Sequence, residues 1–440
     1  MSTHSIPSAQ LHQIVEKTLN AQPIVDLHTH LYTPAFGTPV PNSSGKVDPA
    51  GLLLWGIDEL VTYHYLVAEV FRYVPATKLP YEQFWKMSKQ QQADHIWKYC
   101  FIENTPISEA CRGVLTTIQS LGLDPNEKTL DKYRAWCGEQ DPSKYIDKVM
   151  QISNVSSITM TNPVFDDNER ARWLANPSVG VDPRFTAVLR IDPLLRDWPT
   201  AAKNLSSWGF NVNEEISGKT IEEVRRFLRE WIDRQKAVYL AVSLPPEFRY
   251  PAEADNPIAR AGQTILEKAI LPTCAERGLP WAMMIGSKMR VNPALGDAGD
   301  MVGRSDIASV VNLCHGFPNN KFLVTMLSRE NQHELCVATR KFGNLLLFGC
   351  WWFLNNPSLI EEIERMRIEL LGVSFVPQHS DARVLDQLIY KWNHSRKILV
   401  KVLTDKYSDL AATGWHVTEE QIRRDAKAFL QGNFLNFLSR

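Results

Sequence analysis

The chain has 440 residues, of which 44% are hydrophobic and 22% are charged, as in ordinary globular proteins. This length allows one elaborated domain or two to three smaller ones. The formal net charge of −1 provides no basic field for nucleic acid or for an anionic membrane surface. We therefore expect a small-molecule substrate and neither of those partners, while a second copy of the chain, in a homo-oligomer, stays open.

The seven cysteines are dispersed along the chain and form no Cys-x-x-Cys pair. An odd, scattered set argues against a disulfide framework and favours a reducing compartment. The N-terminus lacks the basic and apolar regions of a signal peptide. The longest apolar run, residues 345–354, is far shorter than the roughly 20 residues that span a bilayer. We expect a cytoplasmic protein.

Short apolar or β-branched runs alternate with helical stretches along most of the chain, which is typical of βα units and a parallel sheet. Several runs are apolar throughout, as expected for strands that are covered on both faces. The pattern predicts an α/β fold, a (β/α)8 TIM-type barrel. Its strands are expected at residues 23–27, 157–161, 186–191, 238–243, 281–285, 322–327, 345–348 and 373–377.

The gap between the first two expected strands is far longer than an ordinary βα connection. Residues 31–156 begin with a loop rich in Pro, Gly and Ser and continue as aromatic-rich helical segments. We interpret them as a helical insertion over the catalytic face of the barrel, which itself comprises residues 1–30 and 157–440. Residues 384–440 are expected to form amphipathic C-terminal helices.

The strongest local signal is the sequence Asp26-Leu-His28-Thr-His30, where an apolar strand ends in His-x-His. Strand alternation places His28 and His30 on the same side. Barrel active sites form at the C-terminal ends of the strands, and two neutral imidazoles there suit a divalent metal, with Zn²⁺ the expected ion. The alternative is a pair of surface histidines at a strand end.

Ser380-Asp381-Ala-Arg383 directly follows the eighth expected strand. The first and eighth strands are neighbours in a closed barrel, so Asp381 is expected to reach the same metal as His28 and His30. A carboxylate there can ligate the metal, act as a general base, or both. Arg383 could bind a substrate carboxylate. The alternative is an Asp that caps the next helix, with a solvated arginine.

Three further patterns follow expected strands or lie over the barrel mouth. Arg190 and Asp192 follow the third strand and could bind an anionic substrate or form a local ion pair. Trp351 and Trp352 follow the seventh strand and could wall a sugar ring or simply pack. His64 lies on an expected helix of the insertion, where a lone histidine is more often structural. Dinucleotide, P-loop, serine-hydrolase and zincin motifs do not occur in the sequence.

Taken in chain order, these motifs resemble those of the uronate (glucuronate) isomerases, a divergent branch of the amidohydrolase superfamily. The resemblance runs from about Pro23 to the last helices. It rests on six segments, residues 26–30, 58–65, 161–163, 189–192, 348–353 and 380–383. The chain departs from the family at two places. Residues 241–246 stand where the family has Asp-His-Gly after strand four, and Met284 stands at the histidine position of strand five.

The resemblance implies an aldose–ketose isomerase of hexuronic acids that works through an enediol. It implies that His28, His30 and Asp381 bind a divalent metal and that Asp381 is the catalytic base. Arg190 and Arg383 would anchor the carboxylate or developing charge. Asp192 and Trp351 would line the substrate site, and His64 and Trp352 would orient hydroxyls and wall the ring. The alternatives are a metal-dependent hydrolase or decarboxylase of a carboxylated substrate, and a non-catalytic sugar-acid-binding homologue.

Overall fold

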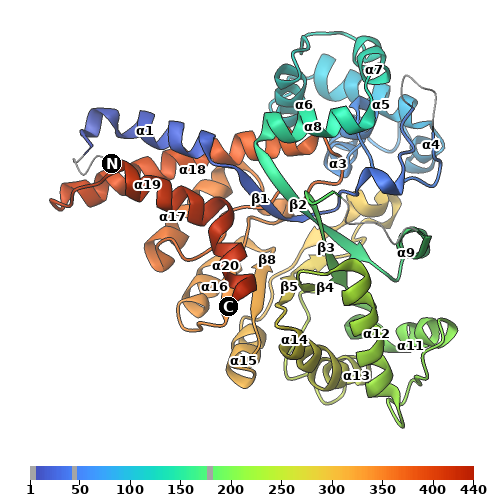
Figure 1. Ribbon diagram of the computed structural model, residues 1–440. Helices are drawn as coiled ribbons and strands as arrows, with labels where there is room; N and C mark the ends of the chain where they lie inside the picture. The colour runs from blue at the N-terminus through green and yellow to red at the C-terminus, as the bar shows by residue number, and fades with distance from the viewer. Residues whose placement is uncertain (1–5, 42–46, 176–181) are drawn as a thin grey trace.

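The computed structural model describes residues 6–41, 47–175 and 182–440. Residues 1–5, 42–46 and 176–181 fall within the ranges assigned above to barrel and insertion and lie outside the described residues. Seven parallel strands form one curled sheet at the centre of the molecule (Figure 1). In sheet order they are β1 (Ile24–Thr29), β2 (Val155–Pro163), β3 (Phe185–Arg190), β4 (Leu240–Leu244), β5 (Trp281–Ile285), β8 (Phe322–Met326) and β9 (Leu345–Leu347).

An extended segment around residues 375–382 connects the two edge strands of this sheet. Val376 forms a parallel bridge with Phe348 and exchanges backbone hydrogen bonds with Leu347 and Gly349 on the β9 side. On the β1 side, the Asp381 N–H donates to His28 O at 3.1 Å, and the His30 N–H donates to Ala382 O at 2.8 Å. The segment therefore completes the ring, and the predicted α/β barrel class is confirmed.

The prediction of a regular eighth strand at residues 373–377 is wrong in detail, because this segment contributes only the single bridge at Val376. Pro377 has no N–H to donate to a ladder. Asp381 adopts a positive φ of 51°, which turns the chain out of the extended conformation. The other seven predicted strands are present, with ends shifted by at most two residues.

Alternating strand residues separate two apolar layers. Residues that point into the barrel, such as Ala282 and Met284 of β5, belong to an inner cluster. Their neighbours Trp281 and Met283 pack instead against the surrounding helices, in the main core. Tyr239 crosses the interior, and its hydroxyl donates to Leu27 O at 2.7 Å. The alternation explains how apolar strands build both layers.

The chain between β1 and β2 begins with a loop and is mainly helical from Ile57 on, and these helices lie above the sheet in Figure 1. They are α2 (Ile57–Val61), α3 (His64–Tyr73), α4 (Tyr81–Trp85), α5 (Lys89–Trp97), α6 (Glu109–Ser120), α7 (Asp131–Gly138) and α8 (Pro142–Ser153). A capping box at Ser88 and Gln91 begins α5, and Asp141 caps the N-terminus of α8. This layer brings α3 over the mouth of the barrel.

The other helices surround the strands. They are α1 (Ser8–Ala21), α9 (Asp167–Ala175), α10 (Asp192–Arg196), α11 (Trp198–Ser207), α12 (Thr220–Gln235), α13 (Pro257–Ile265), α14 (Leu271–Arg277), α15 (Ala308–Gly316), α16 (Gln332–Thr339), α17 (Pro357–Leu371), α18 (Gln387–Ala412), α19 (Glu419–Lys427) and α20 (Asn433–Ser439). A small hairpin of β6 (Ser287–Lys288) and β7 (Met301–Val302) follows β5. Among the described residues, no helix is both long and apolar enough to cross a bilayer.

Candidate active site

His28, His30 and Asp381 meet where β1 ends beside the closing segment. Asp381 Oδ1 lies 3.4 Å from His28 Nε2 and 3.2 Å from His30 Nε2. The three possible ligand atoms all lie within 4.8 Å of one another. His28 is 1% exposed and Asp381 is 6% exposed, whereas the His30 side chain is 19% exposed and forms the more accessible side of the cluster. The two imidazoles and the carboxylate, 351 positions apart at their closest, therefore share one point of the barrel rim.

Buried hydrogen bonds hold the backbone around this cluster. Asp26 is 0% exposed, and its Oδ1 accepts from the Ser380 N–H at 3.1 Å and the His28 N–H at 3.4 Å. Its Oδ2 accepts from Trp392 Nε1 at 2.9 Å. Asp26 thus ties the end of β1 to the segment that carries Asp381.

The chemistry of these three residues fits a divalent metal ion. Neither His28 Nε2 nor Asp381 Oδ1 has a hydrogen-bond partner among the described residues, although both atoms are buried. Buried polar atoms without partners are costly, and a metal ion would satisfy them. His28 Nδ1 lies 3.3 Å from Thr161 Oγ1, which leaves Nε2 directed at the cluster. Two imidazoles and a carboxylate suit Zn²⁺ or a similar ion.

The electrostatics of the cluster favour the protonation states that metal ligation requires. Burial and the positive charge of Arg383 lower the pKa of His30 to about 3, despite the opposing effect of Asp381. Burial opposes ionisation of Asp381, but the neighbouring His28 and His30 hold its pKa well below the ordinary value. At neutral pH, His30 is a neutral donor and Asp381 is a carboxylate.

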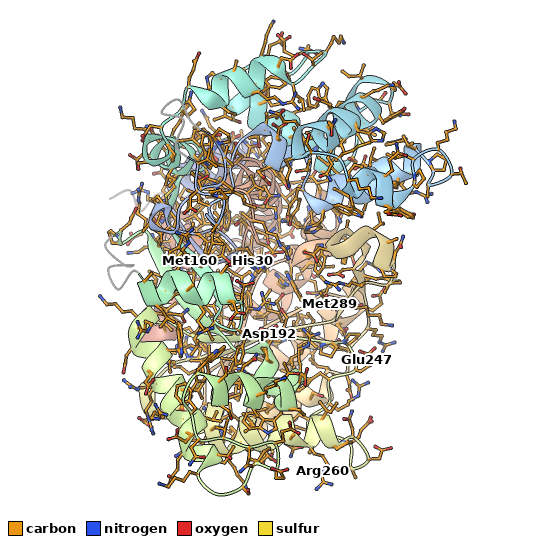
Figure 2. The ribbon with its side chains drawn as sticks, turned by 90° about the vertical axis from the view of Figure 1, so that its right-hand side faces the viewer. His30, Met160, Asp192, Glu247, Arg260 and Met289 are labelled. Atoms are coloured by element: carbon orange, nitrogen blue, oxygen red, sulfur yellow. The ribbon has the colours of Figure 1, made fainter. Side chains whose placement is uncertain are left out.

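The cluster lies in a cavity that also receives every other residue predicted to contact substrate except Asp192, which lies behind Arg190. Its lining includes side chains from the end of β3, the loop after β9, the closing segment and the insertion, namely Arg190, Trp351, Trp352, Arg383 and His64. Figure 2 labels His30 and Asp192 in the middle of the view and Arg260 at its lower edge. The structure therefore brings together residues that are spread over more than 350 positions of the sequence.

His64 begins α3 and faces the cavity with an unpaired Nε2. Its ring packs edge-on against Trp352 at a centroid distance of 5.5 Å. Burial, with Arg383 nearby, lowers the pKa of His64 well below its ordinary value. A neutral imidazole with a free nitrogen can donate to or accept from a substrate hydroxyl.

Trp352 adopts a positive φ of 47°, a strained conformation for a bulky residue. It stacks on Phe353 at 4.6 Å and contacts Trp351 at 6.2 Å between ring centroids. Trp352 and Asp381 are two of six non-glycine residues with positive φ in the described part of the chain. Strain at two cavity residues is the pattern expected of a functional site.

Arg190 and Asp192 form the local ion pair that was one interpretation of their motif, and Arg190 also faces the cavity, as the other interpretation requires. Arg190 Nε donates to Asp192 Oδ2 at 2.7 Å, and its Nη2 donates to Asp192 Oδ1 and Ser243 Oγ, each at 3.1 Å. Arg190 also lines the cavity. The pair is therefore a local bidentate ion pair whose cation faces the site, and Asp192 holds Arg190 rather than lining the cavity itself.

Arg383 projects from the closing segment into the cavity and is 40% exposed at its side chain. Its Nη1 donates to Asp297 Oδ2 at 3.3 Å, on the loop that follows the β6 strand. Its backbone N–H donates to Gln387 Oε1 at 2.8 Å, and the residue at the N-cap position of α18 is Asp386, not Asp381. The predicted alternative, in which Asp381 caps the helix, does not occur.

The two places at which the chain departs from the family pattern both face this cavity. Ser243 of β4 and Met284 of β5 line it, and Met284 is only 3% exposed. Ser243 accepts a hydrogen bond from Arg190, and its N–H donates to Asp192. At β4, a hydroxyl that supports Arg190 thus stands near the position where the family has Asp-His.

Sequence reasoning missed several residues of the site. Lys391 is 3% exposed, and its Nζ donates to Ser380 O. Arg196 lines the cavity one helical turn after Asp192. Because residues four positions apart on a helix lie on the same side, the spacing of Arg196 from Asp192 could have identified it in the sequence. Lys391 lies within a long helix that shows no distinguishing pattern, so the sequence alone held no signal for it.

The fold and this site define a class, a (β/α)8 barrel with a candidate single-ion metal centre at the C-terminal rim. A uronate isomerase from Bacillus halodurans C-125 superposes with a TM-score of 0.91 and 50% sequence identity, covering 99% of this chain and 97% of that chain. The chain belongs to the uronate isomerase family, and the resemblance seen in the sequence is confirmed.

More distant solved structures share the fold. A uronate isomerase from Thermotoga maritima and a glucuronate isomerase from Caulobacter crescentus each match with a TM-score of 0.75 and 14% identity over 98% of this chain. The matches cover 97% and 94% of those two chains. No family model matches the sequence, and no curated protein does.

Proposed function

We propose that the protein interconverts a hexuronic acid and the corresponding ketose acid by proton transfer through an enediol. The observation that carries this proposal is the cluster of His28, His30 and Asp381 at the wall of an arginine-lined cavity. It stands in a chain that is 50% identical to a uronate isomerase over 99% of its length. Such a reaction requires a cavity that binds an anionic substrate and a site for a divalent ion.

The reaction moves one hydrogen between neighbouring carbons of the open-chain sugar. The C2–H bond breaks and a C1–H bond forms, while the C2 hydroxyl loses its proton and the C1 oxygen gains one. Asp381 is the proposed base at C2, since it is an ionised carboxylate that lines the cavity. When bound, a divalent ion supplies a Lewis acid that polarises substrate oxygens. We propose Zn²⁺ held by His28, His30 and Asp381.

Other cavity residues supply binding and orientation. Arg190 and Arg383 place positive charge where the enediolate carries negative charge. The free Nε2 of neutral His64 is suited to a sugar hydroxyl. Trp351 and Trp352 wall the cavity and exclude water. The free, buried state of all seven cysteines supports a cytoplasmic location.

The test is direct. The purified protein is incubated with D-glucuronate and D-galacturonate, and keto-sugar formation is followed together with the bound metal content. Isomerisation of either acid supports the proposal. Bound metal without isomerisation would favour a hydrolase or decarboxylase, and neither metal nor turnover would favour a non-catalytic binding protein. No structural observation favours these two alternatives.

A further inference from the structure

Three arginines line the candidate active site, and they differ in how many hydrogen bonds their guanidinium groups make to other protein groups. Arg190 makes three hydrogen bonds, two to Asp192 and one to Ser243. Arg383 donates to Asp297 at 3.3 Å. Arg196 lies 4.0 Å from Asp192 Oδ1, beyond hydrogen-bond distance, and no other side chain in the described ranges pairs with it. Its planar fork is therefore free to bind a ligand.

The local charge balance around Arg196 is positive. Asp192 carries one negative charge and stands between two arginines, and its carboxylate is engaged in a bidentate pair with Arg190. The trio therefore retains one unit of positive charge. That charge is located on Arg196, whose side chain is 37% exposed, and it matches a single substrate carboxylate.

The residues that line two neighbouring cavities also bear on where the substrate carboxylate would bind. The site cavity shares Arg196 and Leu244 with one neighbouring cavity, and His64, Asp300 and Trp352 with another. The cavity beyond Trp352 is lined by the acidic residues Glu69, Glu109, Asp297 and Asp300 against one lysine. Apart from Arg196 itself, the neighbouring cavity on that side is lined by one arginine, Arg249, and two glutamates, Glu247 and Glu253. The four acidic residues beyond Trp352 disfavour a carboxylate there, and the unpaired guanidinium of Arg196 is the group that can attract it on the other side.

We propose that Arg196 binds the carboxylate of the hexuronate and so sets the specificity of the site for acidic over neutral sugars. The inference rests on the proposed hexuronate isomerase function. Arg190, whose Nε and Nη2 are already engaged by Asp192 and Ser243, then acts mainly by its position and charge. Arg196 is a substrate-binding residue, held at the edge of the cavity by the short helix α10.

The test uses the metal-loaded full chain with the variants Arg196→Met and Arg196→Lys. The matched control is Arg260→Met, which removes an exposed arginine distant from the cavity (Figure 2). KM and kcat are measured for D-glucuronate, and the inhibition constant is measured for neutral D-glucuronamide. Loss of a hydrogen-bonded charge pair predicts a KM about 10- to 100-fold higher in Arg196→Met. The expected kcat and amide inhibition constant stay within about twofold, and Arg196→Lys recovers part of the affinity.

An unchanged KM in Arg196→Met, or an equal rise in KM and in the amide inhibition constant, would overturn the inference while leaving the proposed function intact. If the wild type turned over no hexuronate, the proposed function would fail by itself. Calorimetric binding of D-glucuronate to wild type and variants would then decide the role of Arg196 separately. Circular dichroism checks the fold, and if Arg196→Met does not fold, Arg196→Lys and Arg196→Gln are compared in the same measurements.

Discussion

Lys391 holds the backbone of Asp381, because its Nζ lies 3.2 Å from Asp381 O and 2.6 Å from Ser380 O. Lys391 is buried on α18, between the rings of Tyr63 and Tyr65. The next residue, Trp392, holds Asp26, which in turn accepts from the Ser380 N–H. Consecutive residues of a C-terminal helix thus hold the Ser380–Asp381 backbone from both sides. This explains how Asp381 keeps its left-handed conformation.

Replacing Lys391 with Met should loosen the backbone of Asp381 while leaving all three proposed ligand side chains in the sequence. Two buried carbonyl groups lose a charged donor, which costs about 2–4 kcal/mol of stability. Outer partners of metal ligands are worth roughly 10- to 100-fold in metal affinity. We expect a loss of that order in Zn²⁺ affinity, measured by competition with a chelating dye.

The control for this variant is Lys397→Met, an exposed lysine on the same helix. It should leave stability and metal affinity unchanged. A Lys391→Met protein with wild-type metal affinity would show that α18 does not position Asp381.

Gly349 is required by its contact with His379. Its φ is +68°, and a Cβ atom there would lie 1.8 Å from His379 Nδ1. His379 is fully buried and its ring packs against His28 at 5.2 Å. Gly349→Ala should therefore displace His379, lower metal affinity, and lower the free energy of unfolding measured in urea.

Gly278→Ala separates backbone strain from this collision, because Gly278 has a similar φ of +64° and no atom within 4 Å of its Cβ position. Left-handed backbone alone costs an alanine about 1–2 kcal/mol. Gly349→Ala should cost about 1–3 kcal/mol more than that. Equal losses in the two variants would mean that His379 moves aside freely.

The buried side chain of Glu169 should make the free energy of unfolding depend on pH. It is 1% exposed, and burial raises its pKa to about 8 although the hydroxyl of Tyr32 donates to it. Between pH 4.5 and 8 the folded state keeps a proton that the unfolded state has released, so this group lowers the free energy of unfolding as pH rises. Above about pH 8 its contribution is constant.

Glu169→Gln should therefore flatten the decline in stability from pH 5 to pH 8, measured by urea unfolding at several pH values. Glu420→Gln, at an exposed glutamate, should keep the wild-type profile. Identical pH profiles for Glu169→Gln and the wild type would show that Glu169 ionises normally in the folded protein.

Asp381→Asn tests the proposed base. Asparagine tolerates the left-handed φ of this position, so the thermal unfolding midpoint should stay close to that of the wild type. Removal of a general base costs about 10²- to 10⁴-fold in kcat. The exposed Asp167→Asn serves as the control. Residual activity near that of the wild type would remove Asp381 from the mechanism.

The sequence was sufficient for the barrel and for the clustering of the main site residues. Apolar strands that alternate with helices identify a parallel sheet, and strand alternation puts His28 and His30 on one side. Ring closure then brings Asp381 beside them, at 3.2–3.4 Å. The strands and the shared side of His28 and His30 follow from local periodicity in the sequence. The position of Asp381 follows from the closure of the barrel.

The remaining features depend on tertiary packing. The last segment does not form a full strand, because Pro377 and the positive φ of Asp381 interrupt pairing. Lys391 reaches Ser380 only because α18 packs across the rim. Arg196 stands apart from Arg190 only through the detailed hydrogen bonding of Asp192. Such distinctions depend on whether an atom lies 2.7 Å or 4.0 Å from its neighbour, which no residue pattern specifies.

The most direct measurement follows isomerisation of D-glucuronate by one preparation before metal removal, after complete removal with a chelator, and after addition of one equivalent of Zn²⁺. The account predicts about one bound divalent ion per chain, loss of activity with the ion, and recovery on its return. Full activity in protein shown by elemental analysis to contain no metal would contradict the proposed role of His28, His30 and Asp381.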